Sequence, residues 1–334
     1  MPTAKTTVKK EPANFYEDNY IPYRKCESGS RILRNPSEIY NYLLKKVYKQ
    51  DPYCQDAAMI LWNHCRGITS RNYVCGPAGS GKTYVWQCLQ EIYPKIIIVD
   101  ASTITADGWR GENKATTFLS QVDPADPDVI VVFDEFDKLV CPRYTSGGDN
   151  VSAAIQSEFL KLIEGKALEI KVSNTSSVLI DTSRMSFVLC GSFAEKAREI
   201  ARNNSKKGFG FMSETIVHEA FEDELVLEDL ISFGLIPEMA SRATRLINIH
   251  PLTEDDYIHL IIEHPGSPIK KLEKLYGLRI TVSEEYGRRL AQNAFHAGLG
   301  VRSVTAELQR AIDAEIFLGF RENNKTPKKE VTLG

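Results

Sequence analysis

The sequence contains no long apolar run, and this absence limits where the protein can work. No apolar stretch approaches the ~18 residues that a membrane-spanning helix requires. The N-terminal lysines Lys5, Lys9 and Lys10 are not followed by the apolar segment of a secretory signal. We therefore expect a cytoplasmic protein that does not engage a membrane.

Paired cysteines and a strong excess of charge are also missing. The seven cysteines are scattered and form no CxxC pair, which argues against a zinc site. Cys75 and Cys190 lie inside apolar runs and are expected to be buried thiols. A formal net charge of -3 argues against a general nucleic-acid binder, although a local basic patch is compatible with it. No GxSxG motif or cysteine–histidine arrangement indicates a protease.

The character of the sequence changes along the chain. Residues 1–30 are polar and irregular and are expected to form a flexible arm. The rest divides into a large α/β domain over residues 31–250, a small helical domain over 251–322 and a disordered tail over 323–334. Helix-forming residue types begin at Asn35-Pro36-Ser37-Glu38, and a second helix is expected to carry Ala57 to Trp62.

Short apolar runs alternate with helical segments in the large domain. Four such runs are Tyr73–Cys75, Ile96–Val99, Val129–Phe133 and Met185–Cys190. Unbroken runs rich in β-branched residues are typical of strands that are buried on both faces of a parallel sheet. With the intervening helices they predict a three-layer α/β sandwich, followed by a small all-α C-terminal lid domain.

A glycine-rich loop follows the first of these runs. It consists of Gly76, Pro77, Ala78, Gly79, Ser80, Gly81, Lys82 and Thr83, and it fits the pattern GxxxxGK[ST] of P-loop proteins. The glycines allow backbone N–H groups to point at phosphate oxygens. Lys82 is expected to reach the β- and γ-phosphates of ATP, and the Thr83 hydroxyl is expected to bind Mg²⁺. The helix that begins near Gly81 adds the positive end of its dipole.

Two carboxylates follow another apolar run. Asp134 and Glu135 come directly after Val129–Phe133, at the edge of the sheet where the phosphate loop is also expected. Asp134 would hold Mg²⁺, mostly through water, and Glu135 would polarise the water that attacks the γ-phosphate. The loop and this pair together predict hydrolysis of Mg-ATP.

The chain resembles the ClpX family of AAA+ unfoldases from about Asn35 to Ile316. The resemblance rests on the phosphate loop, on residues 134–138 (DEFDK) and on residues 228–238 (EDLISFGLIPE), of which the last is the most selective. It implies a P-loop AAA+ fold and a ring of identical subunits, with six as the expected number, that pulls protein substrates through a central pore. Such a chain uses ATP and Mg²⁺.

The same resemblance implies roles for two arginines. Arg242 matches the arginine finger, which reaches the γ-phosphate bound to a neighbouring subunit; Arg245 is one turn away and is the alternative. Arg302 matches the second sensor motif, in which an arginine of the lid contacts the nucleotide.

Two further sites are implied by position. Gly108, Trp109, Arg110 and Gly111 stand where the family carries its aromatic pore loop, although a Trp-containing turn could also serve local packing. Val47 and Gln50 align with a family segment, Val-Ile-Gly-Gln, that lines the adenine base. Tyr48 and Lys49 depart from that segment, which could also be the end of a helix.

The departures from the family concern its partners. Only Cys26 occurs in the N-terminal arm, so the zinc-binding N-terminal domain of the family is not expected. Lys207-Gly208-Phe209 replaces the Ile-Gly-Phe loop that docks on the ClpP peptidase, which leaves that partnership open. Two alternative functions are a remodeller of nucleoprotein complexes, which would use basic loops, and an ATP-binding scaffold with little turnover.

Overall fold

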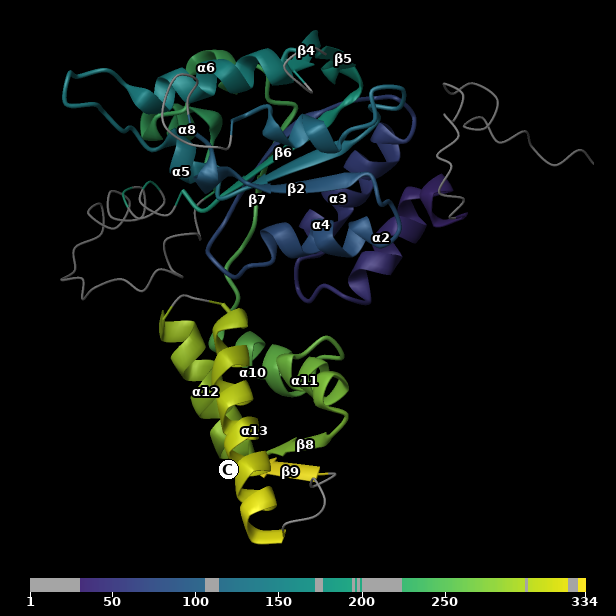
Figure 1. Cartoon of the computed structure of the whole chain (residues 1–334), viewed down its shortest axis with the longest axis vertical. Coiled ribbons are helices and arrows are strands. Elements are labelled where there is room, and N and C mark those ends of the chain that lie inside the picture. The colour runs from purple at the N-terminus through teal and green to yellow at the C-terminus, as the bar shows by residue number, and fades with distance from the viewer. Residues whose placement is uncertain are drawn as a thin grey trace, which may run out of the picture.

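The computed structural model of the chain describes residues 31–105, 114–171, 177–193, 224–297, 300–323 and 330–334, together with Lys196 and Glu199. The first part runs to about residue 250 and combines strands with helices (Figure 1). Its elements are η1 (Arg31–Arg34), α2 (Pro36–Leu44), α3 (Asp51–His64), β1 (Arg71–Cys75), α4 (Lys82–Gln90), β2 (Ile96–Asp100), η2 (Ala101–Thr103), η3 (Thr117–Gln121), β3 (Ile130–Asp134), α5 (Asp137–Val140), α6 (Val151–Ile163), β4 (Ala167–Lys171), β5 (Ser177–Asp181), η4 (Thr182–Arg184), β6 (Ser186–Gly191), α8 (Leu227–Phe233), α9 (Pro237–Ala240) and β7 (Arg245–Asn248).

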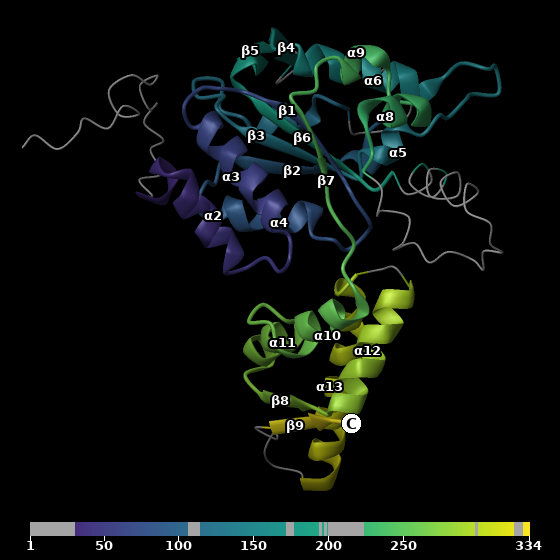
Figure 2. The same cartoon turned by 180° about the vertical axis from the view of Figure 1, so that it is seen from behind.

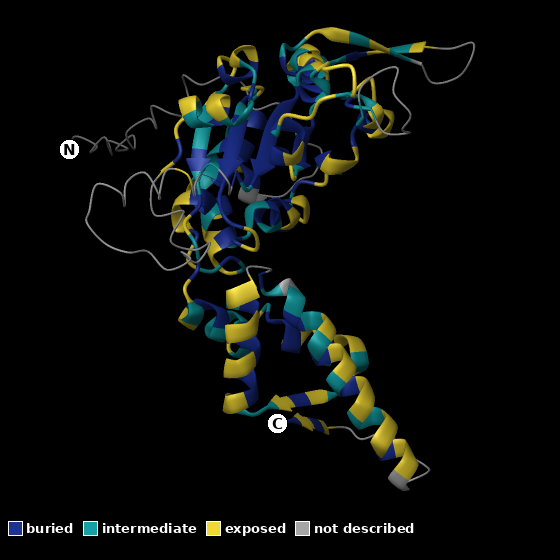
Figure 3. Ribbon diagram, turned by 90° about the vertical axis from the view of Figure 1, so that its left-hand side faces the viewer, coloured by how far each residue is buried: buried dark blue, intermediate teal, exposed yellow. Residues whose placement is uncertain are grey.

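Five strands form the central sheet in the order β2-β3-β6-β1-β7, and all of its pairs are parallel. β1 therefore lies between β6 and β7, and the loop that follows β1 emerges next to the ends of both. β3 lies one strand further along the sheet. The inner strands β3, β6 and β1 are dark blue in Figure 3 because helices cover both faces of the sheet, whereas the edge strands β2 and β7 are largely of intermediate burial.

Alternate residues of each strand enter two separate cores. Val131 and Phe133 of β3 pack with α5, α6, α8 and α9 on one face. Ile130 and Val132 pack with α2, α3 and α4 on the other. Figure 2 shows these two groups of helices on opposite sides of the sheet. The three-layer α/β sandwich with a parallel sheet that the sequence predicts is confirmed.

Local sequence explains where the helices on the second face begin. The Asn35 side chain accepts a hydrogen bond from the Ser37 N–H at 2.8 Å, and Pro36 occupies the first turn of α2. Helix α3 begins at Asp51, earlier than the sequence pattern indicates, with Pro52 in its first turn. Residues 45–50 thus form a connection between two helices, and Val47 and Gln50 are buried within it.

The second part of the chain, which we call the lid, follows residue 250. It contains α10 (Glu254–Ile262), α11 (Pro268–Tyr276), β8 (Arg279–Val282), α12 (Glu284–Ala297), α13 (Arg302–Asn323) and β9 (Glu330–Leu333). Its own apolar core includes Leu290, Leu308 and Ile312. The helical character agrees with the expectation, although the lid is not wholly α-helical, because β8 and β9 form a small parallel sheet.

The expectation that residues 323–334 form a disordered tail is wrong for the described part of that range. Asn323 is the last residue of α13, and Glu330–Leu333 pair with Arg279–Val282. Val331 and Leu333 are buried while the residue between them is exposed. A strand of four residues buries only two side chains, so its alternation is too short to recognise at a chain end.

Three regions with sequence-based expectations lie outside the described residues. These are the N-terminal arm (1–30), the pore-loop candidate Gly108 to Gly111 and the segment Lys206 to Gly210. In the part of the chain that the structure describes, none of the helices combines the length and apolar character needed to cross a membrane.

Candidate functional site

The glycine-rich loop connects β1 to α4. Gly79 and Gly81 adopt positive φ values of 75° and 93°, which glycine tolerates without the steric cost of a side chain. Helix α4 begins directly at Lys82. Its first turn is braced by the buried Tyr53, whose hydroxyl donates to the Lys82 carbonyl oxygen at 2.6 Å and accepts from the Trp86 indole at 2.7 Å. The loop is therefore held between a strand and a fixed helix N-terminus.

The Lys82 ammonium group lies inside the loop. Its Nζ donates to the carbonyl oxygens of Gly76 at 2.8 Å and Pro77 at 2.7 Å. Burial lowers the pKa of Lys82, and the nearby carboxylates of Asp137 and Asp134 act in the opposite direction. A buried cation at this position favours an anionic ligand, because a phosphate would stabilise its charged form.

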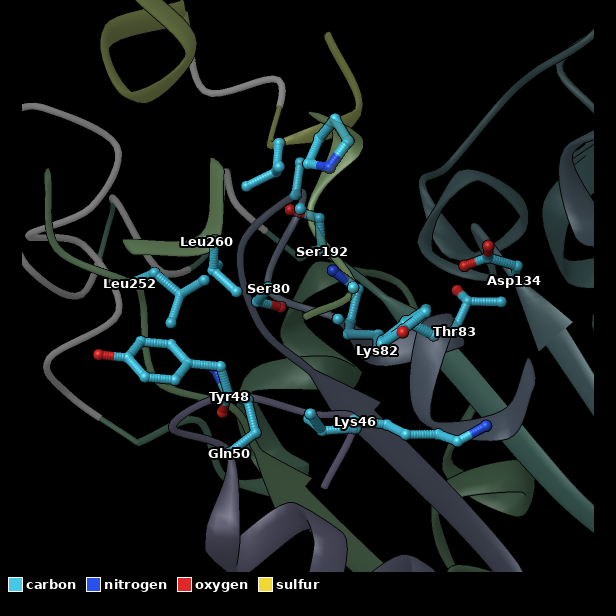
Figure 4. A pocket seen from close by; sticks show the side chains of 18 of the residues that line it. Lys46, Tyr48, Gln50, Ser80, Lys82, Thr83, Asp134, Ser192, Leu252 and Leu260 are labelled. Atoms are coloured by element: carbon cyan, nitrogen blue, oxygen red, sulfur yellow. The ribbon is translucent and has the colours of Figure 1, made fainter. Parts of the chain in front are cut away.

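The carboxylate pair lies at the end of β3, as the sequence predicts. Asp134 is the last residue of the strand, and its Oδ1 accepts from the Glu135 N–H at 3.0 Å. Glu135 has a φ of 55°, which is unfavourable for a residue with a side chain. The next residue stabilises this backbone conformation, because the Phe136 N–H donates to the Cys190 carbonyl oxygen at 2.7 Å. Thr83 and Asp134 point toward one another in Figure 4.

A cavity of about 530 Å³ joins the phosphate loop to the lid. The first part contributes residues from Ala78 to Tyr84, together with Val47, Gln50, Asp134 and Glu135. The lid contributes Leu252, Leu260, His264, Val301 and Thr305, among others. In Figure 4 the acidic end, with Thr83 and Asp134, lies opposite an apolar end formed by Tyr48, Leu252 and Leu260.

Several lining residues were missed by sequence reasoning. Ser192 could have been found, because it directly follows the end of β6 just as Glu135 directly follows β3. Tyr48 was noticed only as a departure from the family's adenine segment, and His264 and Lys271 carry no local signal. His264 and Lys271 lie far from the phosphate loop in the sequence, so only the packing of the lid against the first part brings them to the cavity.

The two candidate finger arginines occupy different surroundings. Arg242 is half-exposed, and its Nη2 lies 3.3 Å from Oε1 of Glu164. It is absent from the described residues that line the cavity. Arg245 pairs with Asp56 of its own chain at 2.6 Å. The Arg302 side chain lies outside the described part, although its backbone begins α13 between the lining residues Val301 and Thr305.

Comparisons with known proteins agree with this geometry. Residues 72–201 match the family model AAA, "ATPase family associated with various cellular activities". The chain is 26% identical over 343 residues to the "ATP-dependent Clp protease ATP-binding subunit ClpX" of Treponema denticola, which covers 90% of this chain and 81% of the relative. This chain has an AAA ATPase domain and resembles ClpX over most of its length.

A second ClpX-like relative comes from yeast. The "ATP-dependent clpX-like chaperone, mitochondrial" of Saccharomyces cerevisiae is 29% identical over 299 residues, covering 72% of this chain and 57% of that protein. The matched AAA region contains the phosphate loop, Asp134 and Glu135. Nucleotide binding and ATP hydrolysis therefore belong to this chain.

His264, a lid residue that lines the cavity, should make the stability of the protein depend on pH. Burial, together with the nearby His259 and Lys271, lowers the pKa of His264 from 6.5. Its Nδ1 accepts a hydrogen bond from the Gly266 N–H at 3.1 Å, which requires a neutral ring. Because the folded pKa is below the unfolded one, the contribution to stability is present above the unfolded pKa and is lost as pH falls through the folded value.

We therefore expect the melting temperature to fall on acidification from about pH 7 to about pH 5. The variant His264→Asn keeps an acceptor for the Gly266 N–H but does not titrate, so its melting temperature should fall less over this range. Differential scanning fluorimetry of both proteins tests this. Parallel curves for the wild type and the variant would show that His264 does not contribute.

Proposed function

We propose that this chain forms a homo-hexameric ring that hydrolyses Mg-ATP and uses the energy to translocate polypeptide through a central pore. The observation that carries the proposal is the division of the catalytic groups. Lys82, Thr83, Asp134 and Glu135 lie at one cavity, whereas Arg242 is half-exposed elsewhere on the same chain. A site that is completed by a neighbour's arginine requires an assembly of subunits, and repeated head-to-tail contacts can close such an assembly into a ring.

The residues at the cavity fit Mg-ATP. The loop N–H groups and Lys82 would hold the phosphates, and the apolar wall that includes Val47 and Leu252 suits a nucleobase. The Thr83 hydroxyl and the Asp134 carboxylate are oxygen ligands of the kind that Mg²⁺ prefers, and this ion needs only a few protein ligands beside phosphate and water. Bound Mg²⁺ would neutralise the charge that develops on the phosphates.

Catalysis and its coupling to the client would depend on an acid–base residue, two arginines and an aromatic residue. Glu135 would accept a proton from the attacking water, while Arg242 of the next subunit would stabilise the charge on the transferred phosphoryl group. Arg302 would connect the nucleotide to α13, so that loss of the γ-phosphate changes the angle of the lid. We propose Trp109, flanked by Gly108 and Gly111, as the group that grips the polypeptide.

Protein clients are favoured by the names of both relatives, one a protease subunit and the other a chaperone. The proposal does not include a peptidase. Lys207 stands where the family's docking loop carries an aliphatic residue, and burying an unpaired ammonium in an apolar pocket is unfavourable.

The proposal predicts that unfolded protein accelerates ATP turnover of the assembled chain. A permanently unfolded polypeptide such as carboxymethylated lactalbumin should raise the steady-state rate roughly two- to fivefold, because the pore loop couples client binding to hydrolysis. Trp109→Ala should abolish the acceleration and leave basal hydrolysis intact, and Trp109→Tyr should retain most of it.

Nucleic acid provides the opposing arm of this experiment. Acceleration by single-stranded or duplex DNA, with no response to unfolded protein, would contradict the proposal and favour the remodelling of nucleoprotein complexes. Loss of basal hydrolysis in Trp109→Ala would show that this residue serves the fold rather than the client.

A further inference from the structure

The connection between α2 and α3 touches the lid at one side of the nucleotide cavity. Lys49 lies in this connection with a φ of 53°, the left-handed conformation that favours glycine. A lysine at such a position costs conformational free energy. The contacts of its side chain offer a physical reason for its presence.

Lys49 forms an ion pair with the first turn of α10. Its Nζ lies 2.5 Å from Oδ1 of Asp256, whose side chain is only 4% exposed, whereas that of Lys49 is 56% exposed. The other carboxylate oxygen of Asp256 accepts from the Thr253 N–H at 2.9 Å and so caps α10. One buried carboxylate therefore fixes the start of a lid helix and binds a cation of the other part of the chain.

The neighbouring Tyr48 adds an aromatic contact to the same helix. Its ring stacks on His259 with centroids 4.4 Å apart and an interplanar angle of 25°. His264 packs with its edge toward Tyr48 at 6.3 Å, and both Tyr48 and His264 line the cavity. The contact between the two parts is thus itself a portion of the cavity wall.

A second contact between the two parts lies at the phosphate loop. Gly79 and Gly300 approach so closely that a Cβ atom on Gly79 would lie 2.3 Å from the Gly300 Cα. Both glycines have positive φ values, 75° and 73°. The lid thus meets the first part at the phosphate loop and again at Tyr48 and Lys49, and residues from both contacts line the cavity.

We propose that Tyr48 and Lys49 form, with Asp256 and His259, a latch that holds the lid over the nucleotide cavity and sets the rate of nucleotide release. The latch acts through the position of the lid, so Lys49 and Asp256 are positioning residues. The latch rests on nucleotide binding in the cavity and is independent of polypeptide translocation.

Release of a fluorescent ADP analogue, mant-ADP, from the full chain measures the latch directly in a stopped-flow chase with excess ADP. Lys49→Gly and Asp256→Asn should each increase the dissociation rate constant, by roughly five- to tenfold for a half-buried charge pair. The double variant should be no faster than the faster single variant, because both changes remove the same interaction.

Lys270 provides a matched control. It pairs with Glu273 inside the lid at 2.8 Å, and its side chain is 54% exposed, similar to that of Lys49. Lys270→Met should leave mant-ADP release unchanged. This control distinguishes the effect of losing any half-exposed lysine from the effect of losing the Lys49–Asp256 pair, which joins the two parts.

Thermal stability distinguishes the latch from a purely structural role. Lys49→Gly relieves the unfavourable φ, so its melting temperature should stay close to that of the wild type even though release is faster. The side-chain amide oxygen introduced by Asp256→Asn could still accept from the Thr253 N–H, which limits damage to α10 in the second variant. Wild-type release rates in Lys49→Gly, or fully additive effects in the double variant, would overturn the proposal. Failure of unfolded protein to stimulate hydrolysis would not change these rates.

Discussion

Replacing Glu135 by glutamine should lower the turnover of ATP by roughly 10²- to 10⁴-fold while nucleotide binding is preserved. The amide has the shape of the carboxylate but cannot accept the proton of the attacking water. Lys82 and Thr83, which would hold the phosphates and Mg²⁺, are unaffected by the change. Steady-state hydrolysis at saturating ATP and equilibrium binding of mant-ATP measure the two properties separately.

The backbone at Glu135 provides a matched control. Its φ of 55° favours glycine, so Glu135→Gly should be as inactive as Glu135→Gln yet at least as stable to heat. Such a separation would show that this strained residue is kept for chemistry. Wild-type turnover in either variant would assign the base to another carboxylate at the cavity, of which Asp137 is the next candidate.

The central fold was predictable because its signals are local. The β3 run Ile130–Asp134 and the β6 run Ser186–Gly191 are buried on both faces, and such unbroken apolar runs identify strands without knowledge of their partners. The strands β7 and β9 contain four residues each and mix polar with apolar side chains. Only pairing with β1 and β8 defines them, and a pairing partner cannot be read from so short a segment.

The site shows the same division between local and distant signals. The phosphate loop and the Asp134-Glu135 pair could be predicted because each kind of chemistry requires adjacent residues in a fixed order. The wall formed by Leu252, Leu260 and His264 could not, since it depends on how the lid packs against the first part. The sequence indicated that Tyr48 and Lys49 were unusual for the family, but not that they contact α10.

Replacing Arg242 by alanine should reduce ATP turnover by roughly 10³-fold or more, the range measured for arginines supplied in trans. Binding of mant-ATP should change little, because the phosphate loop with Lys82 and Thr83, which would hold the nucleotide, is unchanged. Arg245→Ala is the control. It removes an ion pair with Asp56 of the same chain, so it should cost about 0–1 kcal/mol of stability and leave hydrolysis intact.

Mixing two inactive variants decides whether Arg242 acts between subunits. In a ring assembled from equal amounts of Glu135→Gln and Arg242→Ala chains, about a quarter of the sites would pair an intact Glu135 with a neighbour's intact Arg242. These sites should hydrolyse ATP, so activity should return on mixing although each variant alone is inactive. An arginine that acts within its own chain could not give this result, because every chain in the mixture carries one defect. A mixture that stays inactive, with co-assembly shown by differently tagged subunits, would remove the shared site and with it the main support for a ring.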